Sequence, residues 1–281
     1  MGAGDRGRSA GIRWSGCCGL GQAEGVPYPN FADKHDRAAL FGPQEFLAYL
    51  REQGGLHPGQ VPESFVICYE RRLFDELERS PDREPVAHRN RRYFALGSDQ
   101  RRVGVAGGFG IGAPAATVVL EELIALGARR FVSIGLAGAL STNLGVGDVV
   151  LCTDAIRDEG VSHHYVPPGR SITPSAALTA RLERCLHDAG LAVACGRTWT
   201  IDTPYRETLD EVRHYHAEGV LTVEMEAAAL FAVGSHRGVD VAAAFVISDL
   251  LTDDRWHGQF HDAIDPLHRL YHATVDALTA P

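Results

Sequence analysis

Two carboxylates at a strand-to-helix junction are the feature that most constrains this chain. Glu224 and Glu226, separated by Met225, follow the apolar run 220–223 and precede the small and apolar residues 227–233. Burial of an unpaired carboxylate is costly, so this junction is poor material for a simple core. Two roles stay open. The carboxylates point into a cleft and accept hydrogen bonds from vicinal sugar hydroxyls, or they favour the positive end of the following helix dipole.

Length and composition allow one large α/β domain. The chain has 281 residues, of which 45% are hydrophobic and 22% are charged, as in soluble globular proteins. The formal net charge of -9, without a basic patch, argues against a nucleic-acid partner. We therefore expect an anionic substrate to meet only a few local cations.

The cysteines and histidines indicate no metal site and no disulfide framework. None of the six cysteines forms a C-x-x-C pair, and the adjacent His163 and His164 alone do not make a metal site. Cys68 and Cys152 lie in apolar, strand-like runs, so we expect buried, reduced thiols. These patterns predict a protein without a bound metal.

The N-terminal residues differ from the rest of the chain. Residues 1–25 contain eight glycines and little periodic pattern, so we expect a disordered tail followed by one domain at residues 26–281. This tail lacks the apolar core of a secretory signal, and no apolar run reaches the length of a transmembrane helix. We therefore expect a cytoplasmic protein without a membrane partner.

Apolar runs and helix-like runs alternate along the chain, as in an α/β fold. Strands are predicted at residues 64–69, 92–96, 102–106, 130–140, 149–152 and 239–247. Helices are predicted at residues 43–50, 70–77, 115–126, 175–189 and 227–233. Ligands of open α/β sheets bind at the carboxyl ends of the strands, so the site should gather there.

Four segments in this order resemble the motifs of the nucleoside phosphorylase and nucleosidase superfamily, which contains purine and uridine phosphorylases and methylthioadenosine nucleosidases. They are the central strand, helix and glycine turn, the polar segment after the next strand, the ribose-binding signature and the site of the purine general acid, at residues 104–148, 157–168, 223–229 and 248–249. The resemblance implies a single α/β domain with a central mixed, twisted sheet flanked by helices. It also implies a homo-oligomer and no metal or organic cofactor.

The resemblance assigns the sugar contacts. Glu226, helped by Glu224 and Met225, would bind the ribose hydroxyls. His164, in the polar segment 157–168, would lie close to the sugar, with a structural hydrogen bond as its alternative role. The backbone of Gly135 and Gly138 would approach the anomeric face of the sugar, or the phosphate or water that attacks it.

The resemblance also assigns the leaving-group acid. Asp249 would donate a proton to purine N7, with Ser248 beside it at the base and Arg255 a turn beyond to tune the acid. A carboxylate must be protonated to do this, which burial or a nearby negative charge favours. The alternative role of Asp249 is an N-cap at the end of the strand.

Residues 198–207 resemble the base-recognition loop. Tyr205 matches the aromatic position that packs on the base, and Trp199 is a second stacking candidate whose alternative is core packing. Thr208 and Asp210 stand where uridine phosphorylases read uracil with Gln and Arg. The resemblance therefore favours a purine.

The phosphate site departs from the family pattern. Family phosphorylases hold phosphate with a Gly-Asp-Pro-x-Arg turn, where this chain has Tyr69 and Glu70. They also use an Arg and a Ser or Thr, where this chain has Ser133 and Leu136. Nucleosidases also lack that Arg, so these replacements favour hydrolysis.

The nucleophile and its ligands stay open at this point. Arg71 or Arg72 could supply the phosphate cation, or both are solvated helix residues, and Glu70 could orient a water. We predict phosphorolysis of a purine nucleoside, with nucleoside and phosphate as substrates. The alternatives are a hydrolytic nucleosidase and a nucleoside-binding protein without catalysis.

Overall fold

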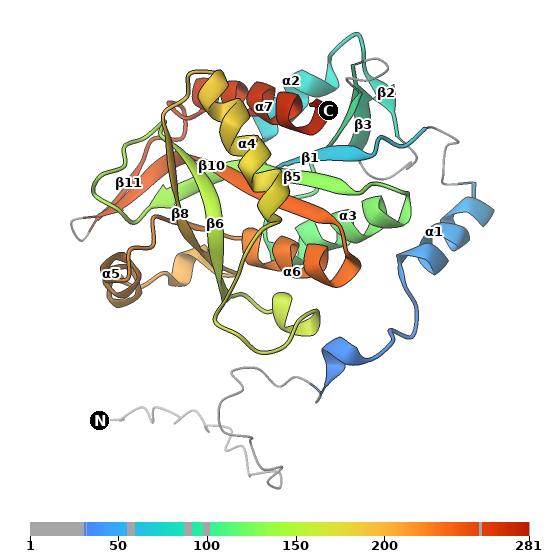
Figure 1. Ribbon diagram of the computed structural model, residues 1–281, viewed down its shortest axis with the longest axis horizontal. Helices are drawn as coiled ribbons and strands as arrows, with labels where there is room; N and C mark the ends of the chain where they lie inside the picture. The colour runs from blue at the N-terminus through green and yellow to red at the C-terminus, as the bar shows by residue number, and fades with distance from the viewer. Residues whose placement is uncertain are drawn as a thin grey trace, which may run out of the picture.

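The computed structural model describes residues 31, 33–54, 60–86, 92–97, 102–252 and 255–280. The chain folds around one mixed sheet that carries helices on both faces (Figure 1). This confirms the predicted fold class, a single α/β domain with a central mixed sheet. The predicted tail, residues 1–25, lies outside the described residues.

Eleven strands make up the sheet: β1 (Ser64–Cys68), β2 (Glu84–Pro85), β3 (Arg92–Leu96), β4 (Val103–Gly107), β5 (Arg130–Ala139), β6 (Val149–Asp158), β7 (Ser171–Ile172), β8 (Val193–Ile201), β9 (Thr222–Glu224), β10 (Asp240–Thr252) and β11 (Arg255–Gly258). Their order is β11-β10-β6-β8-β9-β5-β1-β4-β3-β2, with β7 beside β6. β10 also pairs with β5, so β5, β10, β6, β8 and β9 close into a ring. Parallel pairing joins β4, β1, β5 and β10 and aligns their carboxyl ends.

Two layers of helices cover the sheet (Figure 1). One layer contains α2 (Arg71–Glu78), α4 (Ala176–Asp188) and α7 (Ile264–Thr279), and the other contains α3 (Ala113–Ala125) and α6 (Ala227–Arg237). α5 (Leu209–Ala217) follows β8, and α1 (Pro43–Glu52) belongs to an N-terminal segment in which it packs against α3 and buries Leu47. Short 3-10 turns η1, η3 and η4 occupy Lys34–Asp36, Ser162–His164 and Pro204–Arg206.

The core has a separate apolar cluster on each face of the sheet. Val66 and Cys68 of β1 pack with α2, α4 and α7, whereas Phe65 and Ile67 pack with α3 and α6. A strand buried on both faces therefore reads as a continuous apolar run. The predicted buried thiols are confirmed, because Cys68 and Cys152 are both buried and free.

Three longer elements, β8, α5 and α7, are not among the predicted strands and helices. Two predicted strands also end later than expected, because β6 continues to Asp158 instead of ending at Cys152, and β10 continues to Thr252 instead of ending at Ile247. The prolonged part of β10 is held by β11, whose Gly258 pairs with Asp249. Asp249 is therefore a strand residue, and an N-cap role for it is wrong.

Gly104 provides a test of this packing. It pairs with Phe65 across β1 and β4, and a Cβ added to it would lie 2.2 Å from the Phe65 ring. We expect Gly104→Ala to lower the free energy of unfolding by about 1–3 kcal/mol, because the buried ring must move. Urea denaturation measures this change. The control Gly145→Ala should change it by less than about 0.5 kcal/mol, since the nearest atom there lies 3.8 Å away.

Candidate active site

The sheet register brings the two predicted acidic motifs together at Gly138. This glycine of β5 pairs with Val223 of β9, next to Glu224, and with Asp249 of β10. A Cβ at Gly138 would lie 3.1 Å from Asp249 Oδ2 and 3.2 Å from Val223 Cγ1. Glycine is therefore needed at this crossing, which lies at the carboxyl end of the parallel strands as predicted.

Glu224 holds the start of α6. Its Oε2 accepts hydrogen bonds from the backbone N–H groups of Glu226 and Ala227, each at 2.8 Å. Its Oε1 accepts a hydrogen bond from Thr200 Oγ1 at 2.6 Å. Of the two roles predicted for these carboxylates, Glu224 therefore has the one at the positive end of the helix dipole. Its carboxylate accepts hydrogen bonds from two backbone N–H groups of the first turn that have no partner within the helix.

Glu226 turns away from the helix that it begins. Its Oε1 accepts a 2.5 Å hydrogen bond from the backbone N–H of Gly112, in the loop between β4 and α3. Gly112 has a φ of 94°, a backbone conformation that favours glycine. Met225 lies between the two carboxylates and approaches Gly112 with its methyl group, 3.7 Å from where a Cβ would lie. The loop therefore fixes Glu226 at the site.

The two glutamates differ in how well their charge is stabilised. Both are more than nine-tenths buried, and burial is the main cause that raises the pKa of each. Glu224 accepts three strong hydrogen bonds, whereas the charge of Glu224 further raises the pKa of Glu226. We infer that Glu224 keeps the charge and that Glu226 takes up the first proton.

Glu226→Gln should stabilise the protein at alkaline pH. The pKa of Glu226 is above its ordinary 4.5 in the folded state, so stability falls as pH rises from that value through the folded pKa. Glutamine removes this cost, and we expect the melting temperature at pH 8 to rise by roughly 2–4 °C, with no gain near pH 4. Calorimetry at both pH values measures this. Glu52→Gln, on the exposed end of α1, is the control, and equal shifts in both variants would contradict the assignment.

Asp249 is aimed by an irregularity in β10. The pairing of β10 with β5 shifts register between Ile247 and Asp249, which places Ser248 in a bulge. Ser248 Oγ donates to Asp249 Oδ1 at 2.7 Å, and Trp256 Nε1 donates to Oδ2 at 2.9 Å. Bulges of this kind are common next to active sites, where they redirect a side chain. Arg255 was expected to tune the acid, but the residue that contacts Asp249 is the next one in the chain, Trp256.

An aromatic residue fills the place expected for the phosphate turn. The ring of Tyr69 lies over Gly135, where a Cβ would be 3.1 Å from its Cδ2. Ser133 Oγ donates a 3.2 Å hydrogen bond to the Tyr69 hydroxyl, and Phe109 packs edge-on against the ring with centroids 5.7 Å apart. Burial, followed by the charge of Glu226, raises the pKa of Tyr69 well above its ordinary range. The phenol is therefore neutral.

The predicted phosphate cations point elsewhere. Glu70 is the N-cap of α2 and accepts a 2.8 Å hydrogen bond from Leu73 N, so its carboxylate occupies the helix start. Arg71 lies on the exposed side of α2 beside Asp75, and Arg72 contacts His261 Nδ1 at 2.9 Å. Among the described residues, neither arginine forms a hydrogen bond or ion pair with Glu226.

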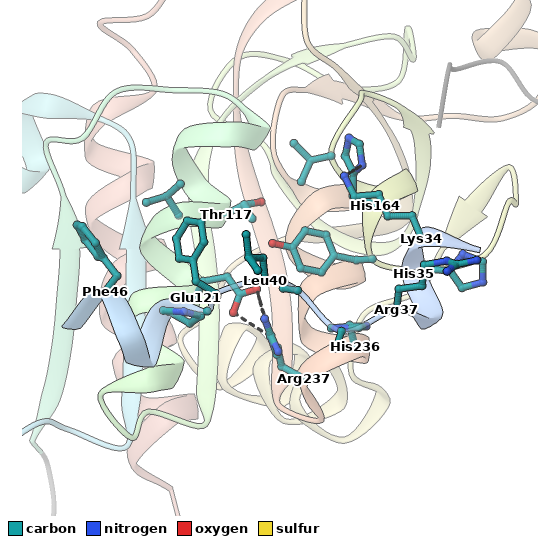
Figure 2. Close-up of a pocket in the computed structure, with 18 of the residues that line it drawn as sticks. Lys34, His35, Arg37, Leu40, Phe46, Thr117, Glu121, His164, His236 and Arg237 are labelled. Atoms are coloured by element: carbon teal, nitrogen blue, oxygen red, sulfur yellow. Dashed lines mark hydrogen bonds and ion pairs between the residues drawn. The ribbon is translucent and has the colours of Figure 1, made fainter. Parts of the chain in front are cut away.

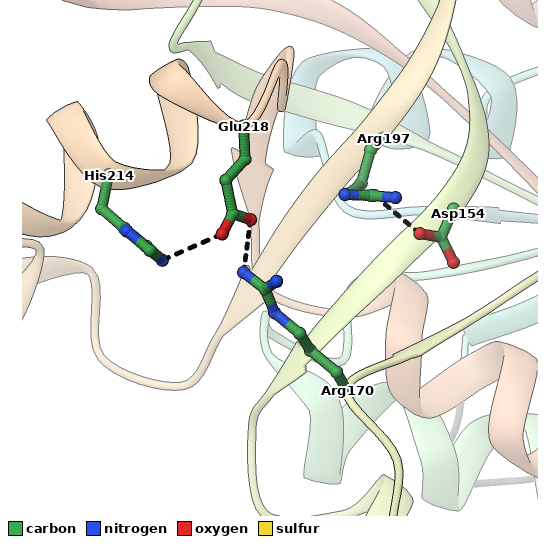
Figure 3. Close-up of polar contacts among 5 residues, drawn as sticks. All are labelled: Asp154, Arg170, Arg197, His214 and Glu218. Carbon is green, nitrogen blue, oxygen red and sulfur yellow. Dashed lines mark hydrogen bonds and ion pairs between the residues drawn. The ribbon is translucent and has the colours of Figure 1, made fainter.

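Two other arginines, near β6 and β8, form ion pairs with carboxylates. Arg197 of β8 contacts Asp154 of β6 at 2.7 Å, and Arg170 contacts Glu218 at the end of α5 (Figure 3). His214 approaches the same Glu218 at 3.2 Å. The first contact joins two neighbouring strands of the sheet, and the second ties the segment after β6 to the end of α5, so both arginines have structural roles.

The two base-binding candidates have opposite environments. Tyr205 lies in η4 and is 99% exposed, so its ring is free to contact a ligand. Trp199 is fully buried, donates to Asp158 Oδ2 and packs against Tyr215 at 4.6 Å. Core packing, the alternative role of Trp199, is therefore what the structure shows.

His164 faces the N-terminal segment. Its Nδ1 lies 2.7 Å from Lys34 Nζ, at a cavity of about 1150 Å³ between that segment and α3 and α6 (Figure 2). Arg237 and Glu121 form an ion pair at the wall of the cavity. The structure thus places His164 at this cavity, and its described hydrogen bond is to Lys34 and not to Glu226.

Three residues of the site region were not predicted from the sequence. Trp256 holds Asp249, Glu159 is fully buried and accepts hydrogen bonds from the backbone at the start of η3, and burial with Asp249 nearby raises the pKa of Glu207 to about 7. The signal for Trp256 was an aromatic residue a few positions beyond the acid, in a run that also carries a glycine. Glu159 and Glu207 have no local signal, because only the fold brings them close.

Within the described residues, no group of three His, Cys, Asp or Glu side chains is arranged to hold a metal ion. In the same part of the chain, no helix is long and apolar enough to span a membrane.

Comparison with known proteins identifies the family. The sequence profile described as "Phosphorylase superfamily" matches residues 69–276. The chain belongs to this superfamily, so the predicted family resemblance is confirmed.

Relatives within the family carry different substrate names. The chain is 34% identical over 149 residues to a uridine phosphorylase of Treponema pallidum, covering 49% of this chain and 58% of the relative. It is 29% identical over 177 residues to a guanosine phosphorylase of Halorubrum lacusprofundi, covering 61% and 73%. The first alignment spans less than two thirds of the relative's own length. These names leave purine and uridine specificity unresolved.

The fold itself also occurs in the family. The solved structure of purine nucleoside phosphorylase from Toxoplasma gondii in complex with immucillin-H superposes with a TM-score of 0.70. The two chains are 19% identical, and the match covers 78% of this chain and 91% of the other. This similarity supports the fold alone.

Proposed function

We propose that this protein cleaves the N-glycosidic bond of a purine nucleoside by phosphorolysis, releasing the free base and ribose 1-phosphate. The observation that carries the proposal is the placement of Asp249 and the Glu224–Glu226 pair on either side of Gly138. One carboxyl group can then serve the leaving base while the other binds the sugar. The names of the relatives support the choice of phosphate as the nucleophile.

The sugar would be bound at Glu226. Its carboxyl group, held by Gly112, would accept hydrogen bonds from the ribose hydroxyls, and Met225 would contact the sugar beside it. Glu224 would keep Glu226 in place through the start of α6. Hydrogen bonds that strengthen as the sugar becomes an oxocarbenium-like species lower the barrier.

The base would leave as a neutral molecule. Asp249 would give its proton to purine N7 while the bond from N9 to the sugar breaks, and Tyr205 would pack on the base. Phosphate would attack the anomeric carbon from the side of Gly135 and Gly138. The raised pKa of Glu226 supports this step, because a protonated carboxyl group repels a phosphate dianion less than a carboxylate does.

Hydrolysis is a second candidate, and a specific observation favours it. Tyr69 and its hydrogen-bonding partner Ser133 lie where the family pattern has phosphate ligands, and the Glu70 carboxylate occupies the start of α2. A neutral phenol and a carboxylate suit a water better than an anion. In this case water replaces phosphate and free ribose is the product.

The deciding measurement is base release from inosine, adenosine, guanosine, uridine and methylthioadenosine, each with and without phosphate. Purine release that requires phosphate and yields ribose 1-phosphate supports the proposal. Release to free ribose without phosphate establishes the second candidate. Turnover of uridine alone contradicts the role of Asp249, and tight binding without turnover indicates a nucleoside-binding protein.

We also propose that the chain forms a homo-oligomer. Large apolar side chains of the N-terminal segment are exposed, with Leu40 at 101%, Phe41 at 69% and Tyr49 at 57%. Apolar groups gathered on one segment are typical of a surface that a partner covers. Light scattering coupled to size-exclusion chromatography measures the mass, and a monomer at micromolar concentration contradicts this proposal.

A further inference from the structure

The indole of Trp256 is the only side chain besides Ser248 that the described residues show hydrogen-bonded to the Asp249 carboxylate. Trp256 Nε1 donates to Oδ2 at 2.9 Å, while Ser248 Oγ donates to Oδ1 at 2.7 Å. Each carboxylate oxygen therefore has one donor. The carboxylate is thereby fixed over Gly138, the residue at which the sugar and base motifs meet.

The β11 strand is shaped so that this contact can form. Asp249 pairs with Gly258, and Trp256 lies two positions before Gly258 on the same face of β11. A Cβ on Gly258 would lie 2.7 Å from Trp256 Cη2. The indole ring thus crosses the space left open by Gly258 to reach the Asp249 opposite.

Core packing does not explain the position of Trp256. The residue is 64% exposed, every residue of β11 is exposed, and β11 is the last strand of the sheet, paired with β10. Its aromatic neighbour, Phe260, is itself 46% exposed. An exposed tryptophan whose N–H is directed at a carboxylate next to the site indicates a functional contact.

We propose that Trp256 is a positioning residue for the leaving-group acid, and that Gly258, because it has no side chain, leaves the space that the indole ring needs to reach Asp249. This inference rests on the proposed function of Asp249. Before the reaction one oxygen of Asp249 carries the proton, and as the O–H bond breaks and the proton passes to purine N7, a negative charge develops on the carboxylate. The indole N–H at Oδ2 and the Ser248 hydroxyl at Oδ1 stabilise that charge, because hydrogen bonds to an ionised acceptor are stronger than those to a neutral one.

The inference predicts an effect that depends on the leaving group. Trp256→Phe keeps an aromatic ring but lacks the N–H, and Gly258→Ala displaces the indole. Each variant should lower kcat for inosine by about tenfold or more with little change in KM, the fold-change expected for a lost hydrogen bond to a charged group. Neither should slow 4-nitrophenyl riboside, whose phenolate leaves without a proton. His257→Phe, on the other face of β11, is the matched control and should match the wild type with both substrates.

A second readout tests the contact without turnover. The indole N–H resonance that disappears in Trp256→Phe should shift in Asp249→Asn and in Gly258→Ala. Equal losses on inosine and the nitrophenyl substrate, or no loss in either variant, overturn the role of Trp256. Full inosine turnover in Asp249→Asn instead refutes the acid and with it the proposed function, so the two failures are distinguishable.

Discussion

Glu226→Gln is expected to lower kcat/KM for a nucleoside by about ten- to a hundredfold. The Glu226 carboxyl group, held by Gly112, is the proposed acceptor for two ribose hydroxyls. Glutamine has one acceptor oxygen and an NH2 group that only donates, and a ribose hydroxyl left without its acceptor in the buried site costs about 1–3 kcal/mol. Steady-state kinetics with inosine or the nucleoside found to be the best substrate measures the loss.

The control for this variant is a sugar without the hydroxyls. With 2′,3′-dideoxyinosine the wild type should already be slow, and Glu226→Gln should slow it little further. Since the same variant should be more stable at pH 8, lost activity cannot come from unfolding. A loss of equal size on both substrates would show that Glu226 does not act through the ribose hydroxyls.

The sequence motif at residues 223–229 predicted the position of the carboxylates because it is local. A short strand, β9, and a helix, α6, follow each other directly, so adjacent residues have to lie at the same end of the sheet. The different roles of Glu224 and Glu226 could not be predicted from this motif, because they depend on contacts with distant parts of the chain. These contacts are with Thr200 of β8 and Gly112 of the loop before α3, which are 24 and 114 residues away.

Strand ends could not be read from hydrophobicity. Residues 248–252 of β10 form a strand since they pair with β11 and β5, and the polar Ser248 and Asp249 concealed this continuation. The same pairing explains why Trp256 was missed, because its contact with Asp249 needs the register of the hairpin. Trp199 is an error in the other direction. It was a candidate for stacking on the base because it lies in the segment that resembles the base-recognition loop, but the fold buries it in the core.

The phosphate site illustrates a limit of resemblance. The replacement of the glycine turn by Tyr69 and Glu70 was visible in the sequence, and the structure gives both replacements defined partners in Ser133 and Leu73. The sequence did not show that Arg71 and Arg72 point to Asp75 and His261, because the direction of a helix face depends on packing. The nucleophile is therefore the least predictable part of the site.

Asp249→Asn should be selective for substrates whose base needs a proton. The asparagine amide fits the same space over Gly138 and can still contact Ser248 and Trp256, but it has no acidic proton to give to N7. General acid catalysis contributes about 10²–10⁴-fold, so kcat for inosine should fall by about that factor. Turnover of 4-nitrophenyl riboside should stay within about threefold, since its leaving group departs as a phenolate.

The comparison between the two substrates makes Asp249→Asn decisive. If Asp249 is the acid, the ratio of the two kcat values changes by at least about a hundredfold, whereas an altered site geometry lowers both together. A Ser248→Ala variant is the matched control, because it removes one of the hydrogen bonds at Asp249 and leaves the acid in place. It should fall between the wild type and Asp249→Asn with inosine, and an unchanged ratio in Asp249→Asn would remove Asp249 from the reaction.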